Sequence, residues 1–580
     1  MVGVSAHVVR VSGSLVELVD LPEAAMFDVV ALGERELPGE VVAIEGDRVT
    51  VQAYEDTGGL APGAAAVSRG EPVSARLGPG LLGGVYDGLL RPLRDAGTWL
   101  APGATRYQDD PRQWQFEPSV TAGEQLSAGD RLGSVVDGGP VKVHVLVPPA
   151  GGGRVDRVVP AGSYASDAVV ATVAGVDVPL TQSWPVRRAR PSRERLDTVE
   201  PLQTGQRVLD LLYPVARGSS AAVRGGFGTG KTVLLQQIAK WSDADVIVYV
   251  GCGERGNEMA DVVTELDALD DPRTGERLTR RTVVIANTSN MPMMAREVSI
   301  YTGVTVAEYF RDMGHHVVLI ADSTSRWAEA LREFASRTGA LPAEEGYPAG
   351  LASALAAFYE RAGHVVTLGG STGSVTIIGA VSPPGGDLTE PVTAHTQRFV
   401  RAVWTLDRDL AYARHYPAVA WSGSFSRDAV AVGAWHVRAG DTQWAHRRGR
   451  VISLLAEADR LTTLAELVGV EAMPGAERVA MLAGRLLREG VLQQNAASRS
   501  DAFCSAAKGA ALVDAVLAVV ERCGALVDAG VPPATVEALD HGPLLRAREE
   551  TGPDDADGVA EHMRSMLDRL AELARTGAAP

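Results

Sequence analysis

The most specific chemical pattern in the chain is the run Gly225-Gly226-Phe227-Gly228-Thr229-Gly230-Lys231-Thr232, which matches G-x-x-x-x-G-K-[ST]. Its glycines let the backbone fold into a nest whose N–H groups point at phosphate oxygens. The helical stretch 231–240 follows at once, so that its positive end faces the same anion. Lys231 is expected to reach the β- and γ-phosphates and the Thr232 hydroxyl to ligate Mg²⁺. The run therefore predicts a site for ATP or ADP together with Mg²⁺.

An apolar run that ends in an acid, His316-Val317-Val318-Leu319-Ile320-Ala321-Asp322, has the pattern of a Walker B strand. A buried strand of this kind delivers its last side chain to the carboxyl edge of a parallel sheet, where α/β proteins bind ligands. Asp322 is expected to hold the Mg²⁺ shell there, through a water molecule. The alternative is an ordinary strand that ends in a turn aspartate.

A third strand candidate, 246–250, runs into the glycine-rich turn Gly251-Cys252-Gly253-Glu254-Arg255-Gly256. Hydrolysis of ATP needs a group that orients and polarises the attacking water near the γ-phosphate. A carboxylate at the edge of the strand beside the P-loop strand suits that task. Glu254 is therefore the candidate catalytic base and Arg255 its expected charge partner. The alternative is a turn glutamate that is only solvated.

The use of basic residues gives a further clue to the P-loop lysine. Of the 55 Lys and Arg residues only four are lysines, namely Lys142, Lys231, Lys240 and Lys508. Arg and Lys are not interchangeable at tight sites, because the ammonium group is compact and the guanidinium is a wide planar fork. A lysine kept in such a chain can be one whose compact ammonium matters, and Lys231 is the lysine of the P-loop.

The elements that must position these residues lie between Leu202 and about Arg427, where apolar runs of strand length alternate with helical stretches. This pattern predicts an α/β fold with a parallel sheet covered by helices. The buried-strand candidates are 246–250, 282–286, 317–321, 365–368 and 375–378.

The remaining segments have other patterns. Short β segments separated by Gly, Asp and Ser turns fill residues 1 to about 70 and predict a small β-barrel. Residues 110–183 are again β-rich, with apolar runs typical of an inserted domain, and Gly78–Leu93 between the two is glycine-rich and then helical in pattern. Beyond about Asp428 the chain predicts amphipathic helices at 451–467, 474–490, 506–529 and 558–573.

Composition and charge exclude several classes of function. A chain of 580 residues predicts three or four domains. It has no uncharged apolar stretch of about 18 residues and no basic region followed by an apolar core at its start, so neither membrane insertion nor an export signal is expected. A net charge of −17 repels nucleic acid. The densest basic run, 187–195, lies in a Pro-containing linker and is interpreted as a solvated connector.

The three cysteines, Cys252, Cys504 and Cys523, lack the spacing of a metal site or a disulfide framework. Scattered cysteines of this kind suit a reducing, cytoplasmic setting, and we expect three small buried side chains.

Several long motifs in order resemble one family, the catalytic A subunit of V/A-type rotary ATPases. They include TQSWPVRRARP at 181–191, GERGNE at 253–258, NTSNMP at 287–292, ADSTSRWAEALRE at 321–333 and AVSPPGGDLTEPVT at 380–393. The resemblance runs from YEDTGGL at 54–60 to LQQNA at 492–496 and is weakest after about residue 505. Ordered motifs over most of the chain are far more specific than a lone P-loop.

The resemblance implies a multidomain layout. It consists of an N-terminal β-barrel (1–70), a RecA-like P-loop domain (71–109 and 184–435), a β-rich bulge insertion (110–183) and a C-terminal helical domain (436–580). It also implies an alternating hetero-hexamer with a B subunit that supplies an arginine finger in trans, and contacts with central and peripheral stalks. The enzyme would hydrolyse or synthesise ATP in the cytoplasm, at the membrane surface, while other subunits move H⁺ or Na⁺.

Adenine recognition follows from the same resemblance. The family segment that matches 415–419 contributes aromatic contacts, so Tyr416 and Phe425 are expected to stack on the base, although either could be ordinary core. Two departures thin this pocket. Ala420 stands where the family usually has Asp or Asn, and Ala497 where it usually has an aromatic. Thr229 stands where eukaryotic vacuolar forms commonly carry Cys, which favours a prokaryotic enzyme.

Two rival functions share the P-loop. A non-catalytic ring subunit would bind nucleotide without turning it over, and the presence of Lys231 and Glu254 argues against it. A RecA-like translocase or export ATPase would act on nucleic acid or polypeptide through a basic pore, which the acidic net charge disfavours.

Overall fold

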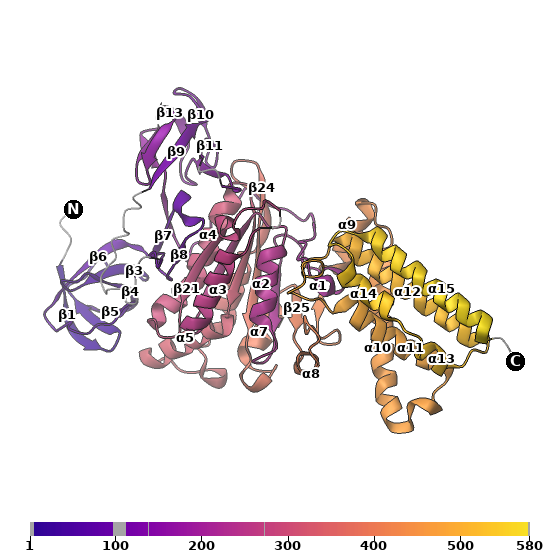
Figure 1. Ribbon diagram of the computed structural model, residues 1–580. Helices are drawn as coiled ribbons and strands as arrows, with labels where there is room; N and C mark the ends of the chain where they lie inside the picture. The colour runs from indigo at the N-terminus through magenta and orange to yellow at the C-terminus, as the bar shows by residue number, and fades with distance from the viewer. Residues whose placement is uncertain (1–4, 95, 97–111, 137–138, 272, 578–580) are drawn as a thin grey trace.

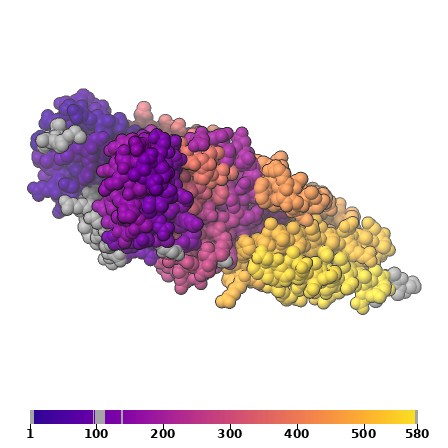
Figure 2. Space-filling view, turned by 90° about the horizontal axis from the view of Figure 1, so that it is seen from above, coloured from indigo at the N-terminus to yellow at the C-terminus, as the bar shows by residue number. Residues whose placement is uncertain are grey.

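The structure is a computed structural model that describes residues 5–94, 96, 112–136, 139–271 and 273–577. The molecule is elongated, with a β-barrel at the N-terminal end, a large sheet covered by helices in the middle and a bundle of helices at the C-terminal end (Figure 1). A second β-rich part projects beside the barrel and the central sheet, and the helical part extends away from both (Figure 2).

The N-terminal barrel is closed by six strands in the order β1-β2-β5-β4-β3-β6. Alternating apolar side chains of these strands, such as Val16, Leu18, Val49 and Val51, fill its interior. Closure leaves no free sheet edge. The strands are β1 (Ser5–Ser12), β2 (Leu15–Val19), β3 (Asp28–Leu32), β4 (Leu37–Glu45), β5 (Arg48–Ala53) and β6 (Ala65–Pro72).

The β-rich insertion consists of two four-stranded antiparallel sheets. The ladder between β7 (Ser74–Leu77) and β17 (Gln182–Pro185) joins the chain entering the insertion to the chain leaving it. One sheet has the order β10 (Gln125–Leu126), β13 (Gly153–Val158), β15 (Val169–Val173), β16 (Val176–Pro179), and the other β12 (Val143–Leu146), β11 (Arg131–Val135), β9 (Gln113–Pro118), β14 (Gly162–Ala165).

The central sheet has ten strands, and its core strands run parallel. The order along the sheet is β26 (Phe425–Ser426), β25 (Ala402–Thr405), β19 (Ser220–Arg224), β24 (Thr372–Val381), β22 (His316–Asp322), β20 (Val246–Cys252), β21 (Thr282–Asn287), β8 (Val85–Tyr86). The short strands β18 (Glu194–Arg195) and β23 (Gly363–Val366) extend it beside β24. Parallel order brings the carboxyl ends of β19, β20 and β22 to one edge.

Helices cover both faces of this sheet, as the alternation along β20 shows. Val246, Val248 and Val250 face one core, which contains helices α4 (Met293–Asp312), α5 (Thr324–Thr338) and α6 (Leu351–Tyr359). Ile247 and Tyr249 face the other core, which contains α2 (Lys231–Trp241) and α3 (Gly256–Ala268). Strands buried on both faces read as continuous apolar runs, and this is why the sequence revealed them.

The C-terminal part is helical and shares the core of the α2 face. Arg207, in the short helix α1 (Arg207–Leu212), joins the two parts through buried bonds to the Asp501 carboxylate at 2.6 Å and the Val491 carbonyl at 2.7 Å. The helices are α9 (Ala429–Arg438), α10 (Trp444–Val468), α11 (Gly475–Leu487) with a π turn (Arg488–Leu492), α12 (Ala506–Asp528), α13 (Pro533–Glu537), α14 (Gly542–Glu550) and α15 (Ala556–Gly577). Among the described residues, no helix combines the length and apolarity needed to cross a membrane.

Two expectations from the sequence are wrong. Gly78–Leu93 holds no α-helix: a single 3₁₀ turn (Pro79–Leu81) precedes strand β8, and Gly83 has a left-handed φ of 76° that interrupts any helix. The basic run 187–195 is not a solvated connector throughout. Arg187 Nη2 lies 2.7 Å from Glu297 Oε2 and 3.1 Å from Glu40 Oε2, and acids from distant parts of the chain cannot be found in a local pattern.

Arg190 in the same run is 4% exposed, with its Nε 2.7 Å from Asp312 Oδ2.

The expectation for the cysteines is confirmed, since Cys252, Cys504 and Cys523 are all free and buried.

Candidate active site

The P-loop joins the end of β19 to the start of α2 and depends on its glycines. Gly228 and Gly230 have left-handed φ values of 78° and 88°, which glycine adopts at no steric cost. A Cβ on Gly225 would lie 2.8 Å from Thr229 Oγ1 and 2.9 Å from Leu406 Cβ, so this position also requires glycine. Phe227 at the tip is 88% exposed. The loop therefore has the backbone form of a phosphate-binding nest.

Lys231 closes this loop from within. Its Nζ donates to the Gly225 carbonyl at 2.7 Å and to the Gly226 carbonyl at 2.9 Å. The Thr229 hydroxyl donates to the same Gly226 oxygen at 2.9 Å. Burial lowers the pKa of Lys231, while the carboxylates of Asp322 and Glu254 act in the opposite direction. The lysine, the loop and both predicted carboxylates thus form one electrostatic unit.

Asp322 ends β22 and faces the first turn of α2. The Thr232 hydroxyl lies 3.5 Å from Asp322 Oδ2, and the Tyr249 hydroxyl donates to the same oxygen at 3.0 Å. Burial raises the pKa of Asp322, and the hydrogen bond from Tyr249 and the charge of Lys231 oppose this shift. The structure therefore brings together Thr232 and Asp322, the two residues that the sequence assigned to the metal.

The donor set fits Mg²⁺ rather than a metal that needs a protein cage. A hydroxyl and a carboxylate are hard oxygen donors, and Mg²⁺ usually keeps several waters and phosphate oxygens beside one or two protein ligands. In the part of the chain that the structure describes, no cluster of three or more His, Cys, Asp or Glu side chains could hold a metal on its own.

Glu254 follows β20 in a turn that is fixed by its backbone. Gly253 has a φ of 73°, and a Cβ there would lie 2.7 Å from Arg326 Cβ, so glycine lets the turn pack on α5. The Ser289 amide donates to the Glu254 carbonyl at 2.9 Å. Burial, aided by the charge of Asp322, raises the pKa of Glu254 to about 7, and Arg326 opposes the shift. Such a carboxyl group can accept a proton near neutral pH.

Arg255 and Arg326 differ in their position relative to Glu254. The Arg255 side chain is 72% exposed, and its Nε lies 4.0 Å from Glu258 Oε1. Arg326 is a cation whose charge acts on Glu254, and it also pairs with Glu329 at 2.9 Å. Sequence reasoning missed Arg326, although its place four residues after Asp322, at the start of α5, was a usable signal. A catalytic role for Arg255 stays a prediction.

The two aromatic residues predicted for adenine lie in neighbouring elements. Tyr416 is 43% exposed, and a Cβ on Gly230 would lie 3.5 Å from its ring, which places the ring against the end of the P-loop. Phe425 lies in β26, with the Arg427 guanidinium 5.6 Å from its ring centre. The Gln494 backbone N–H donates to the Tyr416 carbonyl at 2.8 Å, so the C-terminal part supports this loop. Adenine stacking on either ring remains a prediction.

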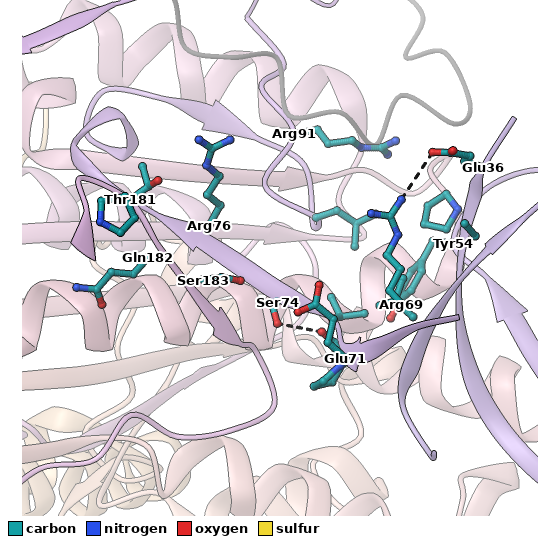
Figure 3. Close-up of a pocket in the computed structure, with 17 residues that line it drawn as sticks. Glu36, Tyr54, Arg69, Glu71, Ser74, Arg76, Arg91, Thr181, Gln182 and Ser183 are labelled. Atoms are coloured by element: carbon teal, nitrogen blue, oxygen red, sulfur yellow. Dashed lines mark hydrogen bonds and ion pairs between the residues drawn. The ribbon is translucent and has the colours of Figure 1, made fainter. Parts of the chain in front are cut away.

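A separate cavity of about 410 Å³ lies away from the P-loop, between the barrel and the β7–β17 ladder (Figure 3). Two arginines in its wall already face acids of this chain. Arg69 Nη2 lies 3.7 Å from Glu36 Oε2, and Arg91 pairs with Glu55 and Asp87. The cavity belongs to the joint between domains and is not part of the P-loop site.

Four family profiles match consecutive parts of the chain. They are described as the ATP synthase alpha/beta family β-barrel domain (residues 8–70), the alpha/beta subunit barrel-sandwich domain (106–187), the alpha/beta family nucleotide-binding domain (205–426) and the C-terminal domain of V and A type ATP synthase (434–527). The last profile is the one whose description names the V and A types.

Curated relatives match along almost their whole length. A V-type ATP synthase alpha chain of Anaeromyxobacter sp. (strain K) is 48% identical over 98% of this chain and 99% of the relative. The A subunit of the A-type ATP synthase of Haloferax volcanii is 46% identical over 93% of each chain.

A solved structure shares the fold at lower identity. The assembled ATPase EscN of the enteropathogenic E. coli type III secretion system is similar with a TM-score of 0.63 and 22% identity, over 89% of this chain and 100% of that one. At this identity the likeness speaks only for the fold.

Proposed function

Because the chain belongs to the family of V-type ATP synthase alpha chains and A-type ATP synthase A subunits, we propose that it is the catalytic subunit of such an enzyme. It hydrolyses or synthesises MgATP, and other subunits couple this reaction to the movement of H⁺ or Na⁺. The observation that carries the proposal is the meeting of P-loop, Asp322 and Glu254 at one edge of the sheet, with Thr232 Oγ1 3.5 Å from Asp322 Oδ2.

Each residue has one task in this proposal. The loop from Gly225 to Gly230 cradles the phosphates, and Lys231 leaves its two loop carbonyls to bind the β- and γ-phosphates. When Mg²⁺ is bound, Thr232 would ligate it and Asp322 would hold its water shell. The chemistry that the ion would supply is neutralisation of the charge on the phosphate oxygens. Glu254 orients the attacking water and accepts its proton, and Arg326 is a positioning residue that holds Glu254 ionised.

The site is completed by a second subunit. Phe227 is 88% exposed and the Arg255 side chain 72% exposed, so the surface beside the P-loop and the Glu254 turn is open to a neighbour. We place the B subunit there, in an alternating hetero-hexamer, with an arginine finger supplied in trans. Such fingers are worth about 10³ to 10⁵ in rate. Arg255 is proposed to act at this shared interface.

The same proposal gives the chain its surroundings. It lies on the cytoplasmic side, peripheral to the membrane, where it contacts the central and peripheral stalks but has no part in the ion path. Tyr416 and Phe425 bind the adenine. A non-catalytic ring subunit is the weaker candidate, because Lys231, Glu254 and Asp322 all lie in one unit.

The test is steady-state ATPase activity of the chain alone and mixed with its matching B subunit. We expect a rise of at least about 10³-fold on mixing, since the finger arrives with the partner. A B subunit with its finger arginine replaced should form the same hexamer and give no such rise. Equal activity with and without the partner would contradict the shared site and favour a self-contained ATPase.

A further inference from the structure

Tyr249 is a buried polar side chain that neither the motifs nor the proposed catalytic roles use. It lies in the middle of β20, paired in register with Ile320 of β22, so that Asp322 is two residues further along the neighbouring strand. Tyr249 and Ile320 share the core on the α2 face of the sheet. The Tyr249 ring is therefore held by a strand interior, and its side chain is 1% exposed.

The hydroxyl of this tyrosine reaches the carboxylate proposed to hold the Mg²⁺ shell. It donates to Asp322 Oδ2 at 3.0 Å, and Thr232 Oγ1 lies 3.5 Å from the same oxygen. A carboxylate on its own turns freely about its last bond, because that torsion is broad and two-fold. A donor fixed in the sheet on one oxygen sets the plane of the group and hence the direction of the other oxygen.

We propose that Tyr249 is a positioning residue for the Mg²⁺ site. Its hydroxyl fixes the orientation of the Asp322 carboxylate, so that this carboxylate can bind the water shell of Mg²⁺ while the Thr232 hydroxyl ligates the ion. This inference rests on the proposed function. Hydrogen-bonding partners of metal-binding side chains typically change metal affinity by about 10- to 100-fold when removed. Tyr249 is neither a metal ligand nor a contact of the nucleotide in this assignment.

The variant Tyr249→Phe removes one oxygen and keeps the ring. The chain offers a matched control, because the Tyr54 hydroxyl also donates to a buried carboxylate, Glu40 Oε2, at 3.0 Å. Tyr54 is likewise 1% exposed, but it lies at the joint between the barrel and the central domain. Tyr54→Phe therefore removes the same kind of bond far from the proposed metal.

The experiment measures binding of a fluorescent ADP to the hexamer assembled with the B subunit, first in EDTA and then at increasing free Mg²⁺. For Tyr249→Phe we expect the Mg²⁺ concentration at half-maximal enhancement to rise about tenfold, while affinity in EDTA is unchanged. Tyr54→Phe should alter neither quantity. Thermal unfolding of both variants verifies that they are folded.

Two results would overturn this inference alone. The first is an unchanged Mg²⁺ dependence in Tyr249→Phe. The second is an equal loss of affinity in EDTA and in Mg²⁺, which would make Tyr249 a packing residue. If the wild-type hexamer itself shows no enhancement by Mg²⁺, the metal site of the proposed function fails as well, so the two failures are distinguishable.

Discussion

Lys231→Arg keeps the charge of the P-loop lysine but changes its shape. In the structure, one ammonium group satisfies two carbonyl oxygens inside the loop, at 2.7 Å from Gly225 and 2.9 Å from Gly226. The guanidinium is planar and wider, and its donors point outward in a fixed fork. It cannot occupy the same space between two successive loop carbonyls, so the variant tests whether geometry or charge matters.

The expected loss of kcat/KM follows from the hydrogen bonds that the variant loses. A hydrogen bond from a charged donor contributes about 1.5–3 kcal/mol. With nucleotide bound, Lys231 exchanges its two loop contacts for two hydrogen bonds to phosphate. If the arginine variant loses one of these two bonds, the cost is about 2 kcal/mol, or roughly 30-fold in kcat/KM. The charge alone would preserve the electrostatic attraction to phosphate, so nucleotide binding should fall less than turnover.

The assay compares kcat/KM of hexamers that carry Lys231→Arg with hexamers that carry Lys240→Arg. Lys240 lies in the last turn of the same helix, with its Nζ 4.6 Å from the ring centre of Trp241. A guanidinium stacks there equally well, so this control should retain wild-type activity. Wild-type activity in Lys231→Arg would refute the reasoning from both the loop geometry and the scarcity of lysine.

The pKa of Glu254 is raised to about 7. Because a base must be deprotonated to accept a proton, kcat/KM should fall about tenfold per pH unit below that value. A flat pH profile of kcat/KM from pH 5 to 8 would contradict this role. Arg326→Gln removes the positive charge that opposes the raised pKa of Glu254. The acid limb of the kcat/KM profile should therefore move to higher pH, by at most about one unit because the arginine is half exposed. Movement of this limb to lower pH would show that Arg326 is not the charge partner of Glu254. Lys508→Met should lower the free energy of unfolding by about 3 kcal/mol, because the fully buried ammonium donates to the Ser500, Arg548 and Thr551 carbonyls at 2.8–3.0 Å. Denaturant unfolding measures this, with exposed Lys142→Met as the control, and equal stability of the two variants would show that these bonds contribute little.

The parts of the fold that could be predicted from the sequence are those in which apolar residues follow the pattern of a buried strand or an amphipathic helix. Residues 317–321 and 246–250 read as buried strands because both faces of β22 and β20 are covered by helices. The expected helix at 506–529 coincides closely with α12, whereas the expected helix at 451–467 covers only the later part of α10, which begins already at Trp444. Long amphipathic repeats are recognised more surely than the ends of a helix. The lysine argument also extends beyond the P-loop, since Lys508 is a buried ammonium among carbonyls.

The parts that could not be predicted depend on contacts between distant segments. The glycine-rich stretch 78–93 offers apolar residues at helical spacing, but its glycines fold it back so that β8 pairs with β21. Arg187 pairs with Glu40 of the barrel and with Glu297 of α4, and both acids are far from it in the sequence.

The same limit applies in the candidate site. Local sequence offered Arg255 as the neighbour of Glu254, whereas the fold brings Arg326 from α5 to the turn. Tyr249 could not be predicted from the sequence for the same reason. Nothing in an apolar strand indicates that its tyrosine is the hydrogen-bond partner of an aspartate 73 residues away.

The measurement that tests the central claim most directly uses Glu254→Gln in the hexamer assembled with the B subunit. Bound nucleotide and steady-state turnover are measured on the same sample. We predict that the variant binds MgATP as the wild type does and loses about 10²- to 10⁴-fold in turnover, because only the group that takes the proton from water has been removed. Turnover at the wild-type rate with MgATP bound would show that Glu254 is not the base and that the assigned site does not carry out the reaction.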